Sequence, residues 1–252
     1  NMTIKMHIVD HNKNQTKLAY MYCEGDLDKP VIVFCGGYKS DMQGTKAQFI
    51  EDFAAQKGYG SLRFDYAGHG RSEGLFEDGT IGSWTKDAKA IIAHCIKDRD
   101  IILIGSSMGG WIALLCALAL GTQVKGIIGI APAPDFTRDM VNEFSDDMKA
   151  DLDLNGYVEL PNDYSDEPYR VTKQLIEEGE ALSLLHAQID ITCPVHLIHS
   201  QKDTVVSWEK SLQIQDCLKT DHVVLKLLKD GDHSVSRPQD LALLAQSIEA
   251  LA

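Results

Sequence analysis

Short apolar runs rich in β-branched residues alternate with longer segments whose apolar positions have helical spacing. Two antiparallel strands are predicted at 5–9 and 17–23, around the turn-rich stretch 11–14. The later apolar runs predict strands at 31–34, 60–64, 101–104, 124–131, 194–199 and 222–228. Helices are predicted at 45–57, 81–96, 110–120, 209–218 and 238–251. This alternation predicts an α/β fold with a mostly parallel sheet of about eight strands, covered by helices on both faces.

The alternation stops after residue 131, where the sequence becomes acidic and irregular up to Asp190. Pro161, Pro168 and Gly156 interrupt this segment, and none of its apolar runs is long enough for a central strand. We therefore predict a core made of residues 2–131 and 191–252, with 132–190 inserted as a small lid over the carboxyl edge of the sheet. The lid is expected to be helical, with a short hairpin near 154–160.

The motif Gly105-Ser106-Ser107-Met108-Gly109 lies between a predicted buried strand and a predicted helix. G-x-S-x-G in that setting is typical of a nucleophile elbow, a sharp turn that lifts the central serine above the sheet edge. The serine at the centre is Ser107. Glycines on both sides leave room for the turn, and the helix N-terminus behind it favours a developing negative charge. Ser107 is therefore the candidate nucleophile.

An activated serine needs an imidazole within hydrogen-bond reach and a carboxylate to orient that imidazole. His233 lies in a polar loop directly after the last predicted strand, where an open sheet places its ligand crevice. The other histidines after the elbow fall within strands or in the insertion: His186, His196, His199 and His222. His233 is therefore the candidate base, and we expect the others to be packed or surface histidines.

Two aspartates could orient the imidazole. Asp203 follows the predicted strand 194–199 and precedes His233, in the chain order nucleophile, acid, base. Asp135 is the rival, because it occupies the loop after the preceding strand. The pattern favours Asp203 and leaves Asp135 open.

Two backbone N–H groups are candidates for an oxyanion hole. The first belongs to Met108, directly after the nucleophile. The second is expected in the loop after strand 31–34, where Gly36-Gly37-Tyr38 lets the backbone approach a substrate. Tyr38 N–H is the preferred second donor, although the two glycines could equally form a plain tight turn.

Composition and net charge argue against several classes of partner and cofactor. A net charge of −13 argues against partners such as nucleic acid or anionic membranes, which need clustered lysine and arginine. The six scattered cysteines show neither C-x-x-C nor zinc-ligand spacing, so reduced thiols and no metal site are expected. The first residues lack a basic stretch followed by an apolar core, so no signal peptide is expected, and no apolar run is long enough to predict a span that crosses a bilayer. We therefore expect a cytoplasmic location and no stable membrane insertion.

The motifs together resemble the α/β-hydrolase superfamily, and more closely its abhydrolase-domain group of palmitoyl-protein thioesterases and acyl-glucuronide esterases. The similarity runs over nearly the whole chain. The segments that carry it are Phe34–Tyr38, Gly44–Ala47, Arg63–Ser72, Ile104–Trp111, Cys193-Pro194, Lys202-Asp203, Trp208 and Gly231–His233. The transit peptide of mitochondrial members of the group is missing from this sequence, which fits a bacterial-type relative.

This resemblance implies an α/β-hydrolase fold and a cofactor-free serine hydrolase with a Ser107, Asp203 and His233 triad. The expected substrates are carboxylic esters or thioesters, acylated proteins included. Two alternatives stay open: a catalytically inactive hydrolase fold that serves in binding, and a nucleotide-binding module at Gly68-His69-Gly70. In the second alternative, the third glycine comes one position late, at Gly74, with Glu73 in its place. A serine at position 107 excludes the aspartate nucleophile of epoxide hydrolases.

Overall fold

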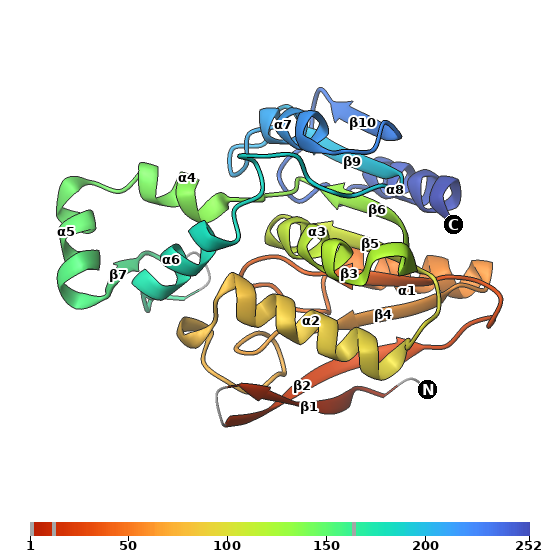
Figure 1. Cartoon of the computed structure of the whole chain (residues 1–252), viewed down its shortest axis with the longest axis horizontal. Coiled ribbons are helices and arrows are strands. Elements are labelled where there is room, and N and C mark those ends of the chain that lie inside the picture. Colours follow the sequence, from red (N-terminus) through yellow and green to blue (C-terminus); the bar gives the residue numbers. More distant parts are fainter. Residues whose placement is uncertain (1–2, 12–13, 163–164) are drawn as a thin grey trace.

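The central sheet of the computed structural model, which describes residues 3–11, 14–162 and 165–252, has eight strands in the order β1-β2-β4-β3-β5-β6-β9-β10 (Figure 1). The β1–β2 and β2–β4 pairs are antiparallel, and the other neighbours are parallel. The predicted mostly parallel sheet is therefore confirmed. Its strands are β1 (Lys5–His11), β2 (Asn14–Cys23), β3 (Val31–Cys35), β4 (Gly60–Phe64), β5 (Ile101–Ser106), β6 (Val124–Ile130), β9 (Val195–Ser200) and β10 (Val223–Leu228). Asn12 and Lys13, in the predicted first turn, lie outside the described residues.

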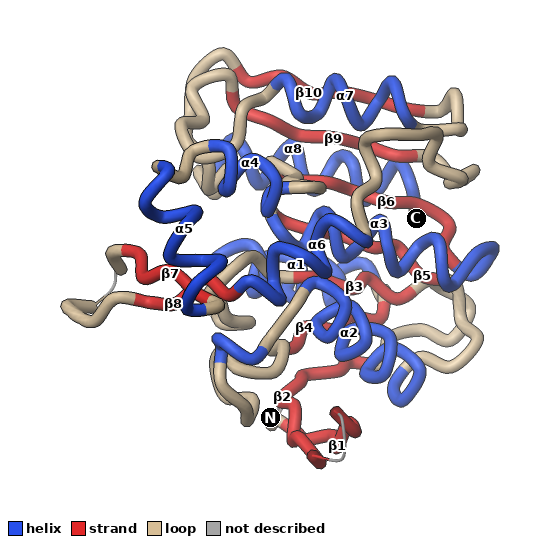
Figure 2. The backbone as a smooth tube through the Cα atoms, turned by 60° about the vertical axis from the view of Figure 1, so that its left-hand side comes forward, coloured by secondary structure: helices blue, strands red, loops and turns tan. Residues whose placement is uncertain are grey.

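Helices cover both faces of this sheet (Figure 2). One face carries α1 (Thr45–Lys57) and α8 (Pro238–Leu251), and the other carries α2 (Ile81–Cys95), α3 (Met108–Leu120) and α7 (Glu209–Cys217). Two short 3₁₀ turns are η1 (Phe76–Asp78) and η2 (Gly121–Gln123).

The sequence of strand β5 is apolar at successive positions because the strand is buried on both faces. Ile102 and Ile104 pack in the hydrophobic cluster under α1 and α8, whereas Ile101 and Leu103 pack in the cluster under α2 and α3. Successive side chains of a strand point to opposite faces, so a strand buried on both faces needs apolar residues at every position. The elbow therefore follows a strand that is buried at every position.

The segment between β6 and β9 forms a separate lobe, at the left of Figure 1. It contains α4 (Phe136–Asn142), α5 (Asp146–Asn155), β7 (Tyr157–Leu160), β8 (Tyr169–Thr172) and α6 (Lys173–Ala181). A short hairpin is present, as predicted near 154–160, but only its first strand lies in that range. Gly156 ends α5 in a left-handed conformation with φ of 80°, and β7 then pairs antiparallel with β8. The strand partner lies further along the chain, beyond the loop that contains Pro161.

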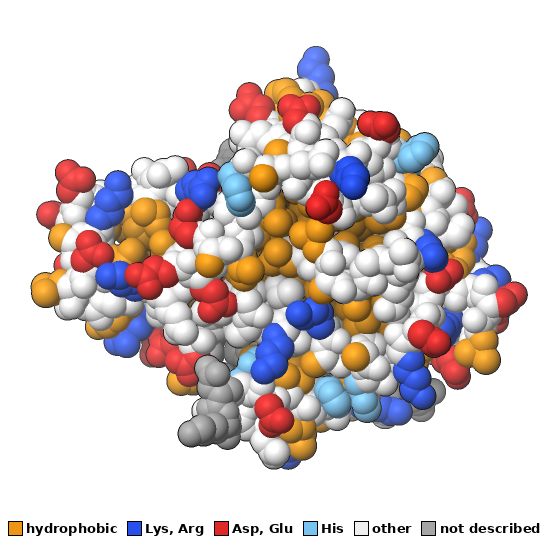
Figure 3. Space-filling view, viewed as in Figure 1, with side chains coloured by type: hydrophobic (Ala, Val, Ile, Leu, Met, Phe, Trp, Pro, Cys, Tyr) orange, Lys and Arg blue, Asp and Glu red, His pale blue; other side chains and the backbone are white. Residues whose placement is uncertain are grey.

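The insertion also accounts for most of the net negative charge of the chain. Residues 132–190 contain fifteen acidic and four basic side chains, a net charge of −11 out of −13. Acidic and basic side chains are spread over the lobe in Figure 3, with apolar and uncharged surface between them, and apolar surface also lies across the middle of the same face. Among the described residues, no helix is both long enough and apolar enough to cross a membrane.

The turn from β5 into α3 leaves no room for side chains at its two glycines. A Cβ atom on Gly105 would lie 2.1 Å from the carbonyl oxygen of Gly109, and one on Gly109 would lie 2.0 Å from that of Cys35. These neighbours are backbone atoms, which cannot rotate away. The elbow therefore depends on glycine at both positions.

We predict that Gly109→Ala lowers the free energy of unfolding by about 1–3 kcal/mol, because the added methyl group overpacks fixed backbone. Gly36→Ala is the matched control, since a Cβ atom there meets nothing within 4 Å. Urea unfolding followed by circular dichroism measures both variants. Equal stability of the two variants would contradict the steric argument.

Candidate active site

The candidate residues come from four strands and meet at one edge of the sheet. Ser107 follows β5, Asp203 lies in the loop after β9, and His233 lies in the loop after β10. The loop after β3 contributes Tyr38. The carboxyl ends of parallel strands share one edge, so residues far apart in sequence come within contact distance there.

Ser107, His233 and Asp203 form a continuous chain of hydrogen bonds. His233 Nδ1 lies 2.7 Å from Asp203 Oδ2, and His233 Nε2 lies 3.2 Å from Ser107 Oγ. An ionised carboxylate only accepts hydrogen bonds, so Nδ1 carries the proton of the neutral ring. Nε2 is then left as the acceptor for the Ser107 hydroxyl. The structure thus brings the three predicted residues together in the arrangement that general-base activation of a serine requires.

The Asp203 carboxylate is fully buried and receives several donors. Oδ1 accepts from the backbone N–H groups of Val205 and Val206, at 2.8 and 2.9 Å. Burial by itself raises the pKa of this carboxyl group, but the bonds from His199, His233 and these N–H groups outweigh it and hold the pKa well below its usual range. Asp203 therefore stays ionised while it orients His233.

His199 is a contact of Asp203 that the sequence did not reveal. It was expected to be a packed histidine, and its side chain is indeed completely buried. Its Nε2 lies 2.9 Å from the carbonyl oxygen of Val206 and 3.4 Å from Asp203 Oδ2, while Nδ1 lies 2.7 Å from Ser211 Oγ. No sequence signal indicated this contact, because a four-residue spacing predicts proximity within a helix, whereas His199 and Asp203 lie in a strand and in the loop after it.

The contacts of Asp135 differ from those expected of a residue that orients the imidazole. Its buried carboxylate accepts hydrogen bonds from Ser183 Oγ and from the backbone N–H groups of Leu184 and Leu185, at 2.8 to 3.0 Å. Asp135 is the N-cap residue of α4, and these three partners lie in the segment that returns to the core after α6. It therefore ties the two ends of the insertion together, and the structure places Asp203 beside His233.

The two candidate oxyanion donors lie beside Ser107. Met108 is the first residue of α3, and N–H groups of the first helical turn have no acceptor within their own helix. Gly37, next to Tyr38, approaches closely enough that a Cβ atom on it would lie 3.6 Å from Ser107 Cβ. The Tyr38 and Met108 side chains both line the same cleft as Ser107. Their roles as donors remain a prediction.

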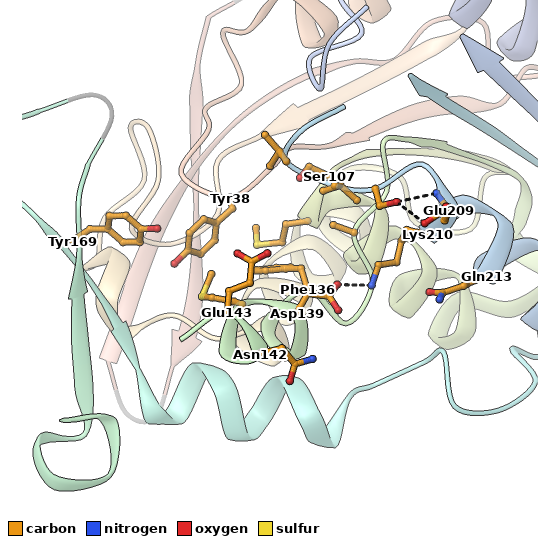
Figure 4. A pocket seen from close by; sticks show the side chains of 16 residues that line it. Tyr38, Ser107, Phe136, Asp139, Asn142, Glu143, Tyr169, Glu209, Lys210 and Gln213 are labelled. Atoms are coloured by element: carbon orange, nitrogen blue, oxygen red, sulfur yellow. Dashed lines mark hydrogen bonds and ion pairs between the residues drawn. The ribbon is translucent and has the colours of Figure 1, made fainter. Parts of the chain in front are cut away.

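Ser107 opens into a cleft of about 660 Å³, a volume typical of sites for small ligands. One part of its wall is apolar and comes from Tyr38, Phe136, Met140 and Val206. Another part is polar: Lys210 on α7 reaches Asp139 on α4, with Nζ 2.5 Å from Oδ2 (Figure 4). The core and the insertion both contribute to the cleft.

The glycine loop considered for nucleotide binding is filled by its own chain. The Asp65 carboxylate accepts from the N–H groups of Arg71 and Met42, at 2.9 and 2.8 Å. A Cβ atom on Gly70 would lie 2.2 Å from Asp65 Oδ2. A buried carboxylate thus occupies the place where a phosphate group would have to bind.

Comparisons with known proteins agree with this geometry. A family model described as serine aminopeptidase, S33, matches residues 28–154. Human palmitoyl-protein thioesterase ABHD10, mitochondrial, is 38% identical over 235 residues, which cover 93% of this chain and 76% of the relative. The chain belongs to the ABHD10 family of α/β hydrolases.

Solved structures support the assignment to this family. The mouse alpha/beta hydrolase domain-containing protein 10 superposes with a TM-score of 0.86 at 35% identity, covering 98% of both chains. A structure from Agrobacterium vitis S4, described as a hydrolase, reaches a TM-score of 0.94 at 40% identity and covers 100% of this chain and 99% of its own. The expected α/β-hydrolase fold and abhydrolase resemblance are thus confirmed.

The expected cytoplasmic location is contradicted by these comparisons. The ABHD10 relatives from human, Pongo abelii and Bos taurus are all named as mitochondrial. The expectation had rested on the residues at the start of the sequence. Targeting segments are removed during processing, so the first residues of a chain do not decide its compartment.

The two aspartates provide a matched test of the site. We predict that Asp203→Asn lowers kcat by about 10⁴-fold, because the amide no longer holds His233 in the required tautomer. Asp135→Asn is expected to keep kcat within about tenfold and to lower the melting temperature instead, since it leaves donors in the insertion unpaired. Steady-state hydrolysis and thermal unfolding measure the two effects. The reverse order of the two losses in kcat would assign the orienting role to Asp135.

The depressed pKa of Asp203 also predicts how stability depends on pH. Its folded-state pKa lies below the unfolded value of about 3.9, so its stabilising effect is present above that pH. The effect is lost as the pH falls through the folded-state pKa. We expect the difference in unfolding free energy between wild type and Asp203→Asn to be largest near neutral pH and to shrink below about pH 4. Urea titrations across this range test the prediction, which a constant difference would contradict.

Proposed function

We propose that Ser107, His233 and Asp203 form the catalytic triad of a hydrolase that cleaves carboxylic esters or thioesters through an acyl-enzyme. The observation that carries the proposal is the hydrogen-bonded chain from Asp203 through His233 to Ser107, at the mouth of a cleft. Membership of the ABHD10 family supports it, because curated relatives are named palmitoyl-protein thioesterases. The protein is accordingly a hydrolase acting on ester or thioester bonds.

In the first half of the proposed reaction, His233 Nε2 takes the proton of Ser107 Oγ as that oxygen attacks the carbonyl carbon of the substrate. The carbonyl oxygen becomes an oxyanion, held by the N–H groups of Tyr38 and Met108. Asp203 stabilises the imidazolium that forms, without taking its proton. The carbonyl then re-forms, and the leaving alcohol or thiol departs with the proton from His233. Ser107 is left acylated.

In the second half, His233 takes a proton from a water molecule that attacks the acyl-enzyme. The oxyanion is again held by Tyr38 and Met108. When the carbonyl re-forms, the bond to Ser107 Oγ breaks, and that oxygen recovers its proton from His233. The carboxylic acid is released and the free enzyme returns. All the groups needed for these proton transfers belong to the protein or to water.

The insertion 132–190 is proposed to act as a lid over the core formed by residues 2–131 and 191–252. Phe136 and Tyr169 from the insertion line the cleft together with Tyr38 from the core. Their rings pack edge to face, with the Tyr38 centroid 5.4 Å from that of Phe136 and 6.2 Å from that of Tyr169. This aromatic wall suits an apolar acyl group.

Acylated proteins are proposed as substrates alongside small acyl esters. The proposal takes its support from the names of the ABHD10 relatives. The cleft itself is compatible with a large leaving group, because Val205 on its wall is 69% exposed and marks an open side. A bulky leaving group could remain outside while the acyl group enters.

The test of this mechanism is covalent labelling together with turnover. We predict that a fluorophosphonate probe labels the wild-type protein and that Ser107→Ala abolishes both the labelling and the hydrolysis of paired thioester and oxygen-ester substrates. Mass spectrometry locates the adduct and a spectrophotometric assay gives kcat. Ser106→Ala is the matched control, because the neighbouring hydroxyl does not contact His233 in the described structure. A wild-type protein that is folded but stays unlabelled and inactive would support the binding role instead.

A further inference from the structure

His69 is a buried histidine that the proposed mechanism does not use. It lies in the glycine loop after β4, and the residue is only 4% exposed. Its Nδ1 lies 3.1 Å from the carbonyl oxygen of Ala67, and its Nε2 lies 3.1 Å from the backbone nitrogen of Lys39. The ring therefore links the loop after β4 to the loop after β3.

These two partners fix the protonation state of the ring. The carbonyl oxygen of Ala67 can only accept, so Nδ1 must carry a proton. The N–H of Lys39 can only donate, so Nε2 must be bare. Burial supports the same state, since it lowers the pKa of His69 to about 4 although the bond to Ala67 acts in the opposite direction. His69 is thus a neutral acceptor at the pH of most assays.

The ring is also fixed in orientation. Aromatic neighbours meet it edge to face, with centroid distances of 5.1 Å to Trp84, 5.3 Å to Phe76 and 5.4 Å to Tyr66. Rotating the imidazole would break both hydrogen bonds and disturb this packing. Nε2 is therefore a hydrogen-bond acceptor in a fixed position opposite the Lys39 N–H.

The position of Lys39 matters because it directly follows Tyr38. Lys39 has a φ of 63°, a left-handed conformation that a residue with a side chain adopts only when its surroundings enforce it. On the other side of Tyr38, the Tyr66 hydroxyl donates to the Gly36 carbonyl at 3.0 Å, and Ser40 N–H donates to the Gly37 carbonyl at 3.2 Å. The peptide units around Tyr38 are thus held from both ends.

We propose that His69 is a positioning residue for catalysis: by accepting the Lys39 N–H, it holds the preceding Tyr38 N–H where the oxyanion forms. This inference rests on the proposed function, in which Tyr38 N–H is an oxyanion donor. Donors of this kind act through exact placement relative to the developing charge, because they are worth about 10²–10³ in kcat when correctly aimed. His69 touches neither the substrate nor the triad in this role.

Two substitutions of His69 distinguish the effect of its hydrogen-bond acceptor from the effect of the volume of its ring. His69→Phe keeps an aromatic ring against Trp84 and Phe76 and removes the acceptor. His69→Gln keeps an acceptor, since its Oε1 can take the place of Nε2 opposite Lys39 N–H. We expect His69→Phe to lower kcat by about 10–100-fold with KM within twofold, and His69→Gln to stay within about threefold of wild type.

A transition-state analogue gives a second readout that a general loss of stability would not produce. An alkyl trifluoromethyl ketone adds to the active serine and places an oxyanion between the same donors. Its affinity should fall in His69→Phe by the same factor as kcat, while the affinity for the carboxylic acid product stays unchanged. Thermal unfolding of each variant is measured alongside.

Three outcomes would overturn the inference: equal losses in His69→Phe and His69→Gln, a loss confined to KM, or an unchanged kcat in His69→Phe. If His69→Phe does not fold, His69→Asn replaces it, because the shorter amide cannot reach Lys39 and should lose activity where His69→Gln does not. Failure of the proposed function looks different, since wild-type protein would then lack hydrolysis and labelling that depend on Ser107.

Discussion

The backbone conformation of Ser107 is the constraint on which the rest of the site depends. Its φ of 56° and ψ of −120° lie outside the regions that residues with side chains normally occupy. Strain of this kind costs about 1–3 kcal/mol and persists only where the surroundings enforce it. Here the enforcement comes from Gly105 and Gly109, which pack directly against backbone, and from β5, which is buried on both faces. The hydroxyl is thereby lifted toward His233.

Three histidines at this edge of the sheet differ in the groups that their two ring nitrogens contact. His233 is partly exposed and bonded to a carboxylate on one side, so its free nitrogen can exchange a proton with Ser107. His199 is completely buried beneath Asp203 and bonded to fixed groups at both nitrogens. His69 is also bonded at both nitrogens, and burial keeps it neutral. Only the first of the three is free to act as a base.

Much of this arrangement could be predicted from the sequence, because the core elements have strong local signals. The helices 45–57 and 238–251 and the strand 60–64 match the structure at both ends. The hairpin in the insertion was placed too early in the chain, because β8 lies beyond a proline-containing loop and local pattern does not identify it as the partner of β7. Asp135 and Asp203 both lie in loops that follow strands, so the sequence pattern could not distinguish the two aspartates. They differ in the side chains that contact them, which depend on the folded structure. The contacts of His69 and His199 depend on partners that no motif specifies.

The loop that carries Tyr38 is also the place where the core meets the insertion. The Lys39 ammonium group lies 3.7 Å from the centroid of the Tyr169 ring, a cation–π contact between the loop after β3 and strand β8. Side chains of this loop thus face the insertion, whereas its backbone is bonded to Tyr66 and His69 of the core. A shift of the insertion would change the aromatic wall that an acyl group contacts. The backbone around Tyr38, which carries a proposed oxyanion donor, would stay in place, because the bonds that fix it come from the core. Under the proposed mechanism, the insertion would therefore act on substrate preference, while the proton transfers would take place at the sheet edge.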